Sequence, residues 1–318
     1  MGLMTHKNLF MSNVFQRPGD PYIYLSVNDV WYCYNPTDPP LGGGSMGTVY
    51  KGYNVDTKAR VAIKRVIDRY SNNTMIRERA KLEASLAFRH KNLVEMIGYC
   101  ESDNNQGPVF ILSKYVNGEN VDKFIAKLPD TPDKIEKICR IIYMVLDALE
   151  YIHSKGVVHR DIKPSNIMVE QGSNVRLMDL GIARMNSGNS FSLLGFIGTP
   201  QYSAPEQILR EKSDTDDSPQ ICAATDIYAL GITMYELITG VNPFKSDNDA
   251  ETLTRQMKDI LPSDKKIPSK LLAVLRKATD KSVCNRYQTA TEFKLAIEDS
   301  LKPTLSWWQK LVSWFKNN

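Results

Sequence analysis

The chain changes character near Gly118, and this change limits the folds that it can adopt. Before that point, short runs of β-branched and aromatic residues predict strands. They cover 22–27, 30–34, 48–53, 60–67 and 109–115, with one helical stretch at 74–89. After it, apolar residues recur at helical spacing over 135–154, 223–239, 270–278 and 291–301. The sequence therefore predicts an α+β fold with a small antiparallel, β-rich N-terminal lobe and a larger, mainly helical C-terminal lobe.

The composition excludes several classes of protein. The chain has 318 residues, with 40 Lys and Arg against 36 Asp and Glu, so a net charge of +4 provides no massed basic face for nucleic acid. No apolar run is long enough to span a membrane, and the N-terminus lacks the apolar core of a secretory signal. The five cysteines form no C-x-x-C pair and are interpreted as reduced thiols. We therefore expect a cytoplasmic protein that binds no nucleic acid.

The residues before Leu41 predict a β-hairpin followed by an interruption. The runs 22–27 and 30–34 are separated only by Asn28 and Asp29, a pair typical of tight hairpin turns. Prolines at positions 36, 39 and 40 then remove backbone donors just before a glycine cluster. The strand that enters this cluster is therefore expected to be short or bulged. We assign 1–40 to an N-terminal extension that contains the hairpin.

A glycine-rich segment and a lysine follow. Gly42, Gly44 and Gly47 form a G-x-G-x-x-G pattern, and glycines let the backbone approach phosphate oxygens. This pattern leads into a β-branched strand, whereas a dinucleotide-binding fingerprint opens a helix. Lys64 stands in the otherwise apolar strand V-A-I-K. It is either a lysine at a sheet edge or a cation directed at nucleotide phosphates.

The loop after the 135–154 helix carries the densest set of polar side chains. Its sequence, V-H-R-D-I-K-P-S-N, places Asp161, Lys163 and Asn166 at short spacing. Asp179 follows beyond a hairpin-like stretch. Two carboxylates and an amide at such loop positions can build an oxygen-rich magnesium site around a polyphosphate.

These motifs occur in the order found in the eukaryotic-type (Hanks-type) protein kinases, and the chain resembles that family. The resemblance continues through G-T-P-Q-Y-S-A-P-E at 198–206 and D-I-Y-A-L-G at 226–231 to Asn285-Arg286-Tyr287. The stretch from Gly198 to Gln207 is most similar to bacterial serine/threonine kinases of this type. The resemblance implies a bilobal kinase fold, with the N-lobe at 41–118 and the C-lobe at 119–302.

The resemblance also implies an activity and roles for single residues. The implied activity is transfer of the ATP γ-phosphoryl group to serine or threonine hydroxyls of protein substrates, including the kinase itself. Asp161 would be the catalytic base, Lys163 would stabilise the transferring group, and Asn166 and Asp179 would hold Mg²⁺, with Mn²⁺ as the alternative ion. The residues implied in ATP binding are Leu41, Gly42, Gly44, Gly47, Val49, Ala62 and Lys64, with Lys114 and Val116 of the hinge. The alternative function is a pseudokinase-like scaffold or partner-binding switch.

The glutamate expected to pair with Lys64 does not stand at its customary place in the family pattern. Its customary place falls near Lys81 and not on an acid, and the candidates are Glu83 and Glu78, of which we prefer Glu83. Other positions have structural roles by the same resemblance. Glu206 would pair with Arg286, Asp226 would anchor the catalytic loop, and His159 and Leu180 would pack between the lobes. Autophosphorylation is expected among Ser187, Ser190, Ser192 and Thr199.

Two further segments are specific to this chain. The acidic loop with Asp214, Asp216 and Asp217 is interpreted as a solvated insertion, with docking of basic substrates as the alternative. The tail 303–318 predicts an amphipathic helix whose apolar face carries Trp307, Trp308, Leu311, Trp314 and Phe315. This helix could pack on its own lobe, dock a partner or lie on a membrane surface, which would make the protein peripheral at a membrane.

Overall fold

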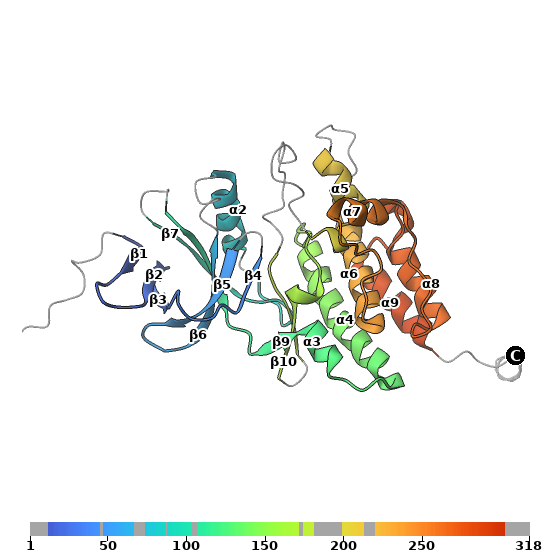
Figure 1. The fold of residues 1–318 in the computed structure, drawn as a ribbon, viewed down its shortest axis with the longest axis horizontal. Coiled ribbons are helices and arrows are strands. Elements are labelled where there is room, and N and C mark those ends of the chain that lie inside the picture. Colours follow the sequence, from blue (N-terminus) through green and yellow to red (C-terminus); the bar gives the residue numbers. More distant parts are fainter. Residues whose placement is uncertain are drawn as a thin grey trace, which may run out of the picture.

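The computed structural model describes residues 12–44, 47–66, 74–86, 88–102, 107–171, 174–180, 199–212 and 220–302. They form two lobes, one built mostly of strands and one built mostly of helices (Figure 1). This arrangement confirms the predicted α+β class with a β-rich N-lobe and a helical C-lobe. None of the helices in the described part of the chain is long and apolar enough to cross a membrane.

The N-lobe is an antiparallel sheet with the strand order β1-β2-β3-β5-β6-β8-β7, in which β4 also pairs with β5. The strands are β1 (Val14–Gln16), β2 (Ile23–Val27), β3 (Val30–Tyr34), β4 (Gly42–Gly44), β5 (Gly47–Asn54), β6 (Arg60–Val66), β7 (Met96–Glu101) and β8 (Val109–Lys114). Helix α2 (Thr74–Ser85) packs against β7 and β8. It ends four residues before the predicted helix does, and Phe88 instead contacts the ring of Tyr151 in the C-lobe at 5.9 Å.

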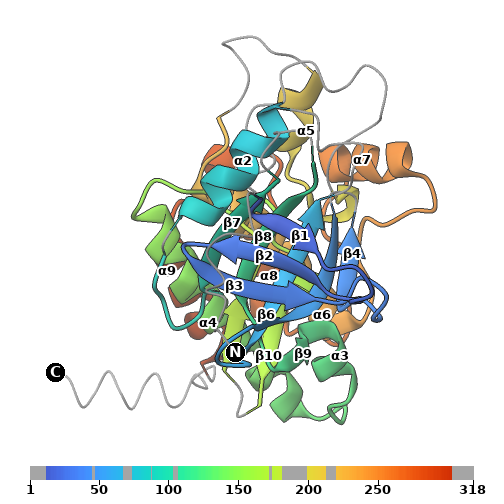
Figure 2. The same cartoon turned by 90° about the vertical axis from the view of Figure 1, so that its left-hand side faces the viewer.

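The N-terminal hairpin is present and belongs to the N-lobe sheet. Strands β2 and β3 pair around Asn28 and Asp29, whose φ angles of 51° and 63° suit the tight hairpin turn. Strand β2 also lies against β7, where Asn28 Nδ2 donates to the carbonyl oxygen of Ile97 at 3.2 Å. Figure 2 shows β1, β2 and β3 in front of the remaining strands. The hairpin thus covers the face of the sheet that points away from the helical lobe.

The strand that enters the glycine cluster is interrupted, as the prolines predict. Strands β3 and β4 pair with the same edge of β5, with Tyr34 opposite Gly52 and Gly42 opposite Val49. The eight residue steps from Tyr34 to Gly42 therefore face only three steps on β5, from Gly52 to Val49. Five residues are looped out of the strand pairing. The loop is closed locally by Asn35, whose side-chain oxygen accepts hydrogen bonds from the following segment.

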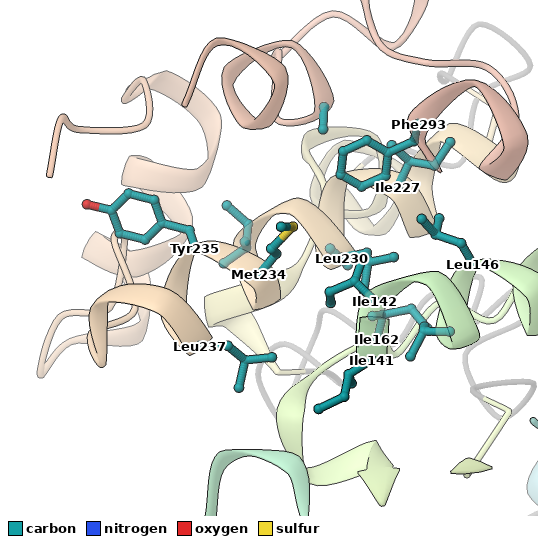
Figure 3. Close-up of a cluster of buried hydrophobic side chains, with 14 of the residues drawn as sticks. Ile141, Ile142, Leu146, Ile162, Ile227, Leu230, Met234, Tyr235, Leu237 and Phe293 are labelled. Carbon is teal, nitrogen blue, oxygen red and sulfur yellow. The ribbon is translucent and has the colours of Figure 1, made fainter. Parts of the chain in front are cut away.

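The C-lobe is built around two long helices that face each other. Its helices are α3 (Val121–Ala126), α4 (Pro132–His153), α5 (Pro205–Lys212), α6 (Ala223–Thr239), α7 (Asp249–Lys258), α8 (Ser269–Ala278) and α9 (Ala290–Leu301). Figure 3 shows side chains of α4 and α6, with Phe293 of α9, gathered in one cluster. Helix α6 is apolar almost all round and is buried along nearly its whole length, as expected of a central helix.

A small sheet holds the loops that face the N-lobe. It has the order β11-β10-β9, with β9 (Gly118–Asn120), β10 (Ile167–Glu170) and β11 (Val175–Leu177). The polar loop 158–166 lies between α4 and β10. In that loop Ile162 is fully buried among Ile141, Ile142 and Leu230 of the C-lobe core (Figure 3). The residues beside Ile162 are therefore anchored to the C-lobe core.

Candidate active site

The polar loop 158–166, which the resemblance implies is the catalytic loop, is held through its backbone by one buried carboxylate. Asp226 of α6 is fully buried and accepts hydrogen bonds from the backbone N–H groups of His159 at 2.8 Å and Arg160 at 2.7 Å. The ring nitrogen Nε2 of His153 lies 2.8 Å from the same carboxylate. Because charge-assisted hydrogen bonds are stronger than neutral ones, Asp226 fixes the loop to the central helix. This is the anchoring role expected from the sequence.

Two residues of the site adopt backbone angles that few side chains tolerate. Arg160 has φ of 67° and Asp179 has φ of 50°, both in the left-handed region. Such conformations persist only where the surrounding structure enforces them, and they are concentrated at functional sites. Asp161 directly follows the strained Arg160, and Asp179 is itself strained, so each of the two loops carries a carboxylate at or next to such a position.

Three polar side chains, those of Asn166, Lys163 and Thr199, converge at Asp161. Asn166 Nδ2 donates to the carbonyl oxygen of Asp161 at 2.8 Å and to its Oδ2 at 3.0 Å. Lys163 Nζ lies 3.0 Å from Oδ2 of Asp161 and donates to Thr199 Oγ1 at 2.8 Å. The side chains of Asp161 and Lys163 keep 14% and 20% of their surface exposed, so both can still meet a ligand.

His159 links this loop to the segment that carries Asp179. The ring is fully buried, and burial lowers its pKa, which favours the neutral imidazole. In the tautomer that fits both contacts, Nε2–H donates to the carbonyl oxygen of Met178 at 2.9 Å and Nδ1 accepts from the N–H of Asp161 at 3.3 Å. The N–H of Met178 also donates to the carbonyl oxygen of Asn166 at 2.9 Å. Asp179 is thereby held next to the catalytic loop.

An ion pair joins the two lobes across the site. Lys64 Nζ of β6 lies 3.6 Å from Oδ1 of Asp179, and the two side chains are 20% and 44% exposed. Lys64 is opposite Val49 and Ile111 in the sheet, so it occupies an interior strand rather than a sheet edge. This position excludes the edge-lysine interpretation. A cation beside a partly exposed carboxylate is suited to binding a polyphosphate with its metal ion.

The glycine-rich segment lies on β4 and β5, and Val49 of β5 is paired with Lys64 of β6. A Cβ atom at Gly47 would lie 2.5 Å from the carbonyl oxygen of Arg65, so packing requires glycine there. A Cβ atom at Gly42 or Gly44 would meet no described atom within 4 Å. Glycine at these two positions is therefore not explained by packing against the described residues, and it leaves the backbone open to a ligand.

The remaining candidate nucleotide contacts lie just before this segment, on β6 and in the connection between the lobes. Leu41 donates its N–H to Val49 and is 47% exposed, as a residue at the mouth of a site would be. Ala62 lies on β6 two residues before Lys64. Lys114 ends β8 and Val116 is buried just beyond it, in the connection between the lobes.

Comparison with known families identifies the fold. The sequence profile of the protein kinase domain matches residues 37–298. This chain belongs to the protein kinase family. The serine/threonine-protein kinase PknB of Mycolicibacterium smegmatis is 32% identical over 264 residues, which are 80% of this chain and 41% of that protein. A probable serine/threonine-protein kinase of Clostridium perfringens is 33% identical over 259 residues, covering 79% and 36%.

Solved structures agree on the fold. The kinase domain of PknI from Mycobacterium tuberculosis superposes with a TM-score of 0.64 at 22% identity, covering 89% of this chain and 96% of that one. The kinase chain described here spans about two-fifths of the length of the curated relatives that it matches. The N-terminal hairpin lies before the first residue matched to the family.

The kinase C-lobe contains the expected buried ion pair. Arg286 contacts both oxygens of Glu206, with distances of 2.8 and 2.9 Å, and the side chains are 0% and 1% exposed. Thr225 adds a hydroxyl donor to Glu206 at 2.7 Å. The pair ties the start of α5 to the segment before α9, as the resemblance implies.

Some residues of this site were not anticipated, and others are not described. His153 was missed, although a histidine on the buried side of an apolar helix is a signal that could have identified it. The side chain of Glu83 lies outside the described residues, as do the candidate phosphorylation sites Ser187, Ser190 and Ser192. The acidic loop 213–219 and the tail 303–318 lie outside them as well.

Proposed function

We propose that the chain is an ATP-dependent serine/threonine protein kinase that transfers the γ-phosphoryl group to protein hydroxyls. The observation that supports this most strongly is the convergence of Asp161, Lys163, Asn166 and Thr199 beside the Lys64–Asp179 ion pair. Phosphoryl transfer depends on positioning and charge neutralisation, and this arrangement can provide both. The pseudokinase alternative is not favoured, because the relatives that match most of the chain are themselves named serine/threonine-protein kinases.

In the proposed reaction Asp161 is the catalytic base. The substrate hydroxyl oxygen attacks the γ-phosphorus, the bond to the β–γ bridging oxygen breaks, and Asp161 accepts the hydroxyl proton. Lys163 already contacts Asp161 and Thr199, so its ammonium group lies where negative charge would develop. Thr199 belongs to the G-T-P-Q-Y-S-A-P-E stretch, which in this family builds a surface for protein substrates, so its contact with Lys163 supports proteins as the acceptors.

Asn166 and Asp179 are the proposed ligands of Mg²⁺, with Mn²⁺ as the alternative. The donor set fits a hard cation, since both contacts of the Asn166 nitrogen go to Asp161 and its amide oxygen is the atom suited to ligation. The Asp179 carboxylate is 44% exposed and can face a cation. When bound, the ion neutralises phosphate charge and orients the γ-phosphoryl group.

ATP is proposed to lie between the glycine-rich strands and the connection between the lobes. The backbone of Gly42, Gly44 and Gly47 would cover the phosphates, and Lys64 would contact them. Leu41, Val49 and Ala62 would cover the adenine, and the backbone of Lys114 and Val116 would bind its edge. The open surroundings of Gly42 and Gly44 support this placement.

Glu83 remains the proposed partner of Lys64. The competing candidate, Glu78, is exposed to solvent on α2. At 100° per residue, Glu83 stands close to the sheet-facing side of the helix marked by Ala80, whereas Glu78 does not. This position on the helix supports Glu83 as the partner of Lys64, and so as a member of the proposed catalytic set together with Asp161 and Lys163.

The location and partners of the kinase are proposed from the sequence. We propose a cytoplasmic kinase with protein substrates and no nucleic-acid partner. Attachment to a protein partner or to a membrane surface through the tail, with Trp307, Trp308, Leu311, Trp314 and Phe315, remains a hypothesis.

Incubation of the purified chain with radiolabelled Mg·ATP and a panel of protein substrates tests the proposed activity. We expect phosphate on serine or threonine, and a loss of about 100-fold or more in Asp161→Asn, which removes the base. Asp147→Asn is the matched control, because Asp147 pairs with Lys294 on the far helices. Absence of label on every substrate and on the chain itself would contradict the proposal.

A further inference from the structure

Helix α2 is tied to the edge strand β7 by charged side chains centred on Glu101. Arg77 Nη1 donates to Glu101 Oε2 at 2.5 Å, and Lys81 Nζ lies 2.7 Å from Oε1. The hydroxyl of Tyr99 also donates to Oε2, at 2.6 Å. Both carboxylate oxygens are therefore used, and the helix is held at two points about one turn apart.

These contacts are more restrictive than ordinary surface ion pairs. Arg77 is 5% exposed, and its second nitrogen donates to the carbonyl oxygen of Gly107 at 2.5 Å. Burial alone would raise the pKa of Glu101, but hydrogen bonds from Lys81, Tyr99 and Arg77 outweigh it, and the pKa lies below its ordinary value. The carboxylate thus stays ionised and the contacts stay charge-assisted. Lys81 also lies 5.5 Å above the Tyr99 ring.

The positions of Arg77 and Lys81 on α2 determine which flank of the helix faces the sheet. Arg77 and Lys81 are four residues apart and share one flank of α2. Ala80 and Ala84 pack towards the sheet. At 100° per residue, Glu83 stands on the flank opposite Lys81. Because β7 is the edge strand and receives Arg77 and Lys81, the flank that carries Glu83 is turned towards β6.

Strand β6 presents Lys64 to this side of the sheet. Residues alternate between the faces of a strand, so Lys64 and Val66 share one face. Val66 packs with Ala80 of α2, whereas Ile63 packs with the hairpin on the other face. Rotation of α2 about its axis would therefore change the distance between Lys64 and the position of Glu83.

We propose that Arg77, Lys81 and Glu101 are positioning residues that fix the rotation of α2 and so place Glu83 beside Lys64. This inference rests on the proposed kinase function. It also accounts for a departure from the family pattern, because Lys81, which lies near the customary glutamate position, is engaged by Glu101. The pairing acid then stands two residues further along the helix.

A double-mutant cycle on Lys81→Gln and Glu83→Gln tests the inference. Lys81 is half-exposed, so removing its charge is expected to leave the fold intact. We expect Lys81→Gln to lower kcat by about 5- to 10-fold, and by less than about 2-fold in the Glu83→Gln background, because residues acting through one another are not additive. Lys81→Arg should restore most of the rate.

Glu136→Gln is the matched control, since it breaks an exposed pair with Arg140 in the C-lobe and should leave kcat unchanged. All assays are run at a temperature where circular dichroism shows every variant folded. Equal effects of Lys81→Gln in both backgrounds would overturn the inference, because a merely structural role adds to the loss of Glu83. No effect of Lys81→Gln on the rate would overturn it as well.

The same cycle separates this inference from the proposed function. If Glu83→Gln is as active as the unmodified chain, the proposed Lys64–Glu83 pair is wrong, and the positioning inference falls with it. If Glu83→Gln is impaired and Lys81→Gln is not, only the positioning inference is wrong. If the unmodified chain transfers no phosphate, the proposed function is wrong, which the assay with Asp161→Asn detects independently.

Discussion

The two lobes bury their cores in different ways. In the C-lobe, one continuous cluster runs through α4, α6, α8 and α9, and its buried residues all lie within the part matched to the kinase family. In the N-lobe, the cluster on the hairpin side is small, and four of its buried side chains come from outside that match. These are Leu25, Val27, Tyr32 and Tyr34. The lobe that would hold ATP therefore depends on a segment that the family pattern does not include.

This difference separates two kinds of support for the active site. The catalytic loop is fixed from the C-lobe through Asp226 and Ile162. Lys64 and the glycine-rich strands are fixed from the N-lobe, where the hairpin covers one face of the sheet and α2 covers the other. Changes in the hairpin should therefore affect nucleotide binding first, and changes in the C-lobe should affect the whole fold.

Removal of residues 1–34 is expected to have the largest effect. Burial of a single Leu or Val side chain contributes about 1.5–3 kcal/mol. Loss of four large buried side chains therefore approaches the whole stability of a domain, about 5–15 kcal/mol. We expect loss of binding to a fluorescent ATP analogue, with helical circular dichroism retained from the C-lobe. Unchanged affinity for the analogue would show that the N-lobe does not need the hairpin.

Arg286→Ala is the corresponding test in the C-lobe. It leaves the buried Glu206 carboxylate without its main partner, and breaking such a pair costs about 3–5 kcal/mol. We expect the urea midpoint of the whole C-lobe to fall. The control is Lys302→Ala, which breaks an exposed pair with Asp299 and should cost less than about 1 kcal/mol. Equal effects of the two substitutions would contradict the view that this pair supports the C-lobe.

The features that could be predicted from the sequence are those set by neighbouring residues in the chain. The hairpin was predictable because Asn28 and Asp29 have local turn chemistry, and the interrupted strand was predictable because proline lacks a donor. The convergence of Asp161, Lys163 and Asn166 could be expected because the residues are close in the chain and lie in one loop. Each of these features depends on residues that are close together in the chain, so a single sequence is enough to predict it.

Long-range contacts could not be predicted in this way. Nothing local indicates that the hairpin folds back onto β7, or that Glu101 receives both Arg77 and Lys81 of α2. The predicted helix was too long because Leu86 and Ala87 continue the apolar spacing of Leu82 in the sequence, whereas α2 ends at Ser85 and Phe88 packs on the C-lobe. The partner of a charged side chain is set by tertiary packing. The sequence alone therefore does not decide between Glu83 and Glu78 as the partner of Lys64.

Leu25→Ala is a milder form of the hairpin deletion. Leu25 is fully buried in the small N-lobe core, and replacing such a side chain with alanine costs about 2–5 kcal/mol. We expect weaker binding of the ATP analogue as well as a lower unfolding midpoint. Leu295→Ala is the control, because Leu295 is 58% exposed on α9 and its truncation should change neither quantity. If Leu25→Ala lowers the midpoint without weakening binding, the hairpin supports the lobe but not the nucleotide site.

The smallest expected effect is a dependence of stability on mild acid. Burial lowers the pKa of His159 below its ordinary value of 6.5, so the folded kinase resists protonation of this ring. The unfolded chain then binds this proton more readily than the folded chain does. The contribution of neutral His159 to the free energy of unfolding is complete above pH 6.5 and is lost as the pH falls towards the pKa of His159 in the folded state. The free energy of unfolding should decrease below pH 6.5 by up to about 1.4 kcal/mol per pH unit.

Urea titrations at pH 7.5, 6.5 and 5.5 measure this slope above the range in which carboxylates titrate. Burial also lowers the pKa of His90, so the experiment is best done in a His90→Gln background, which leaves His159 as the main buried imidazole with a lowered pKa. Because His159 holds Met178 beside the catalytic loop, acid should weaken the connection between Asp161 and Asp179. A free energy of unfolding that stays constant from pH 7.5 to 5.5 would mean that His159 is not the neutral link described here.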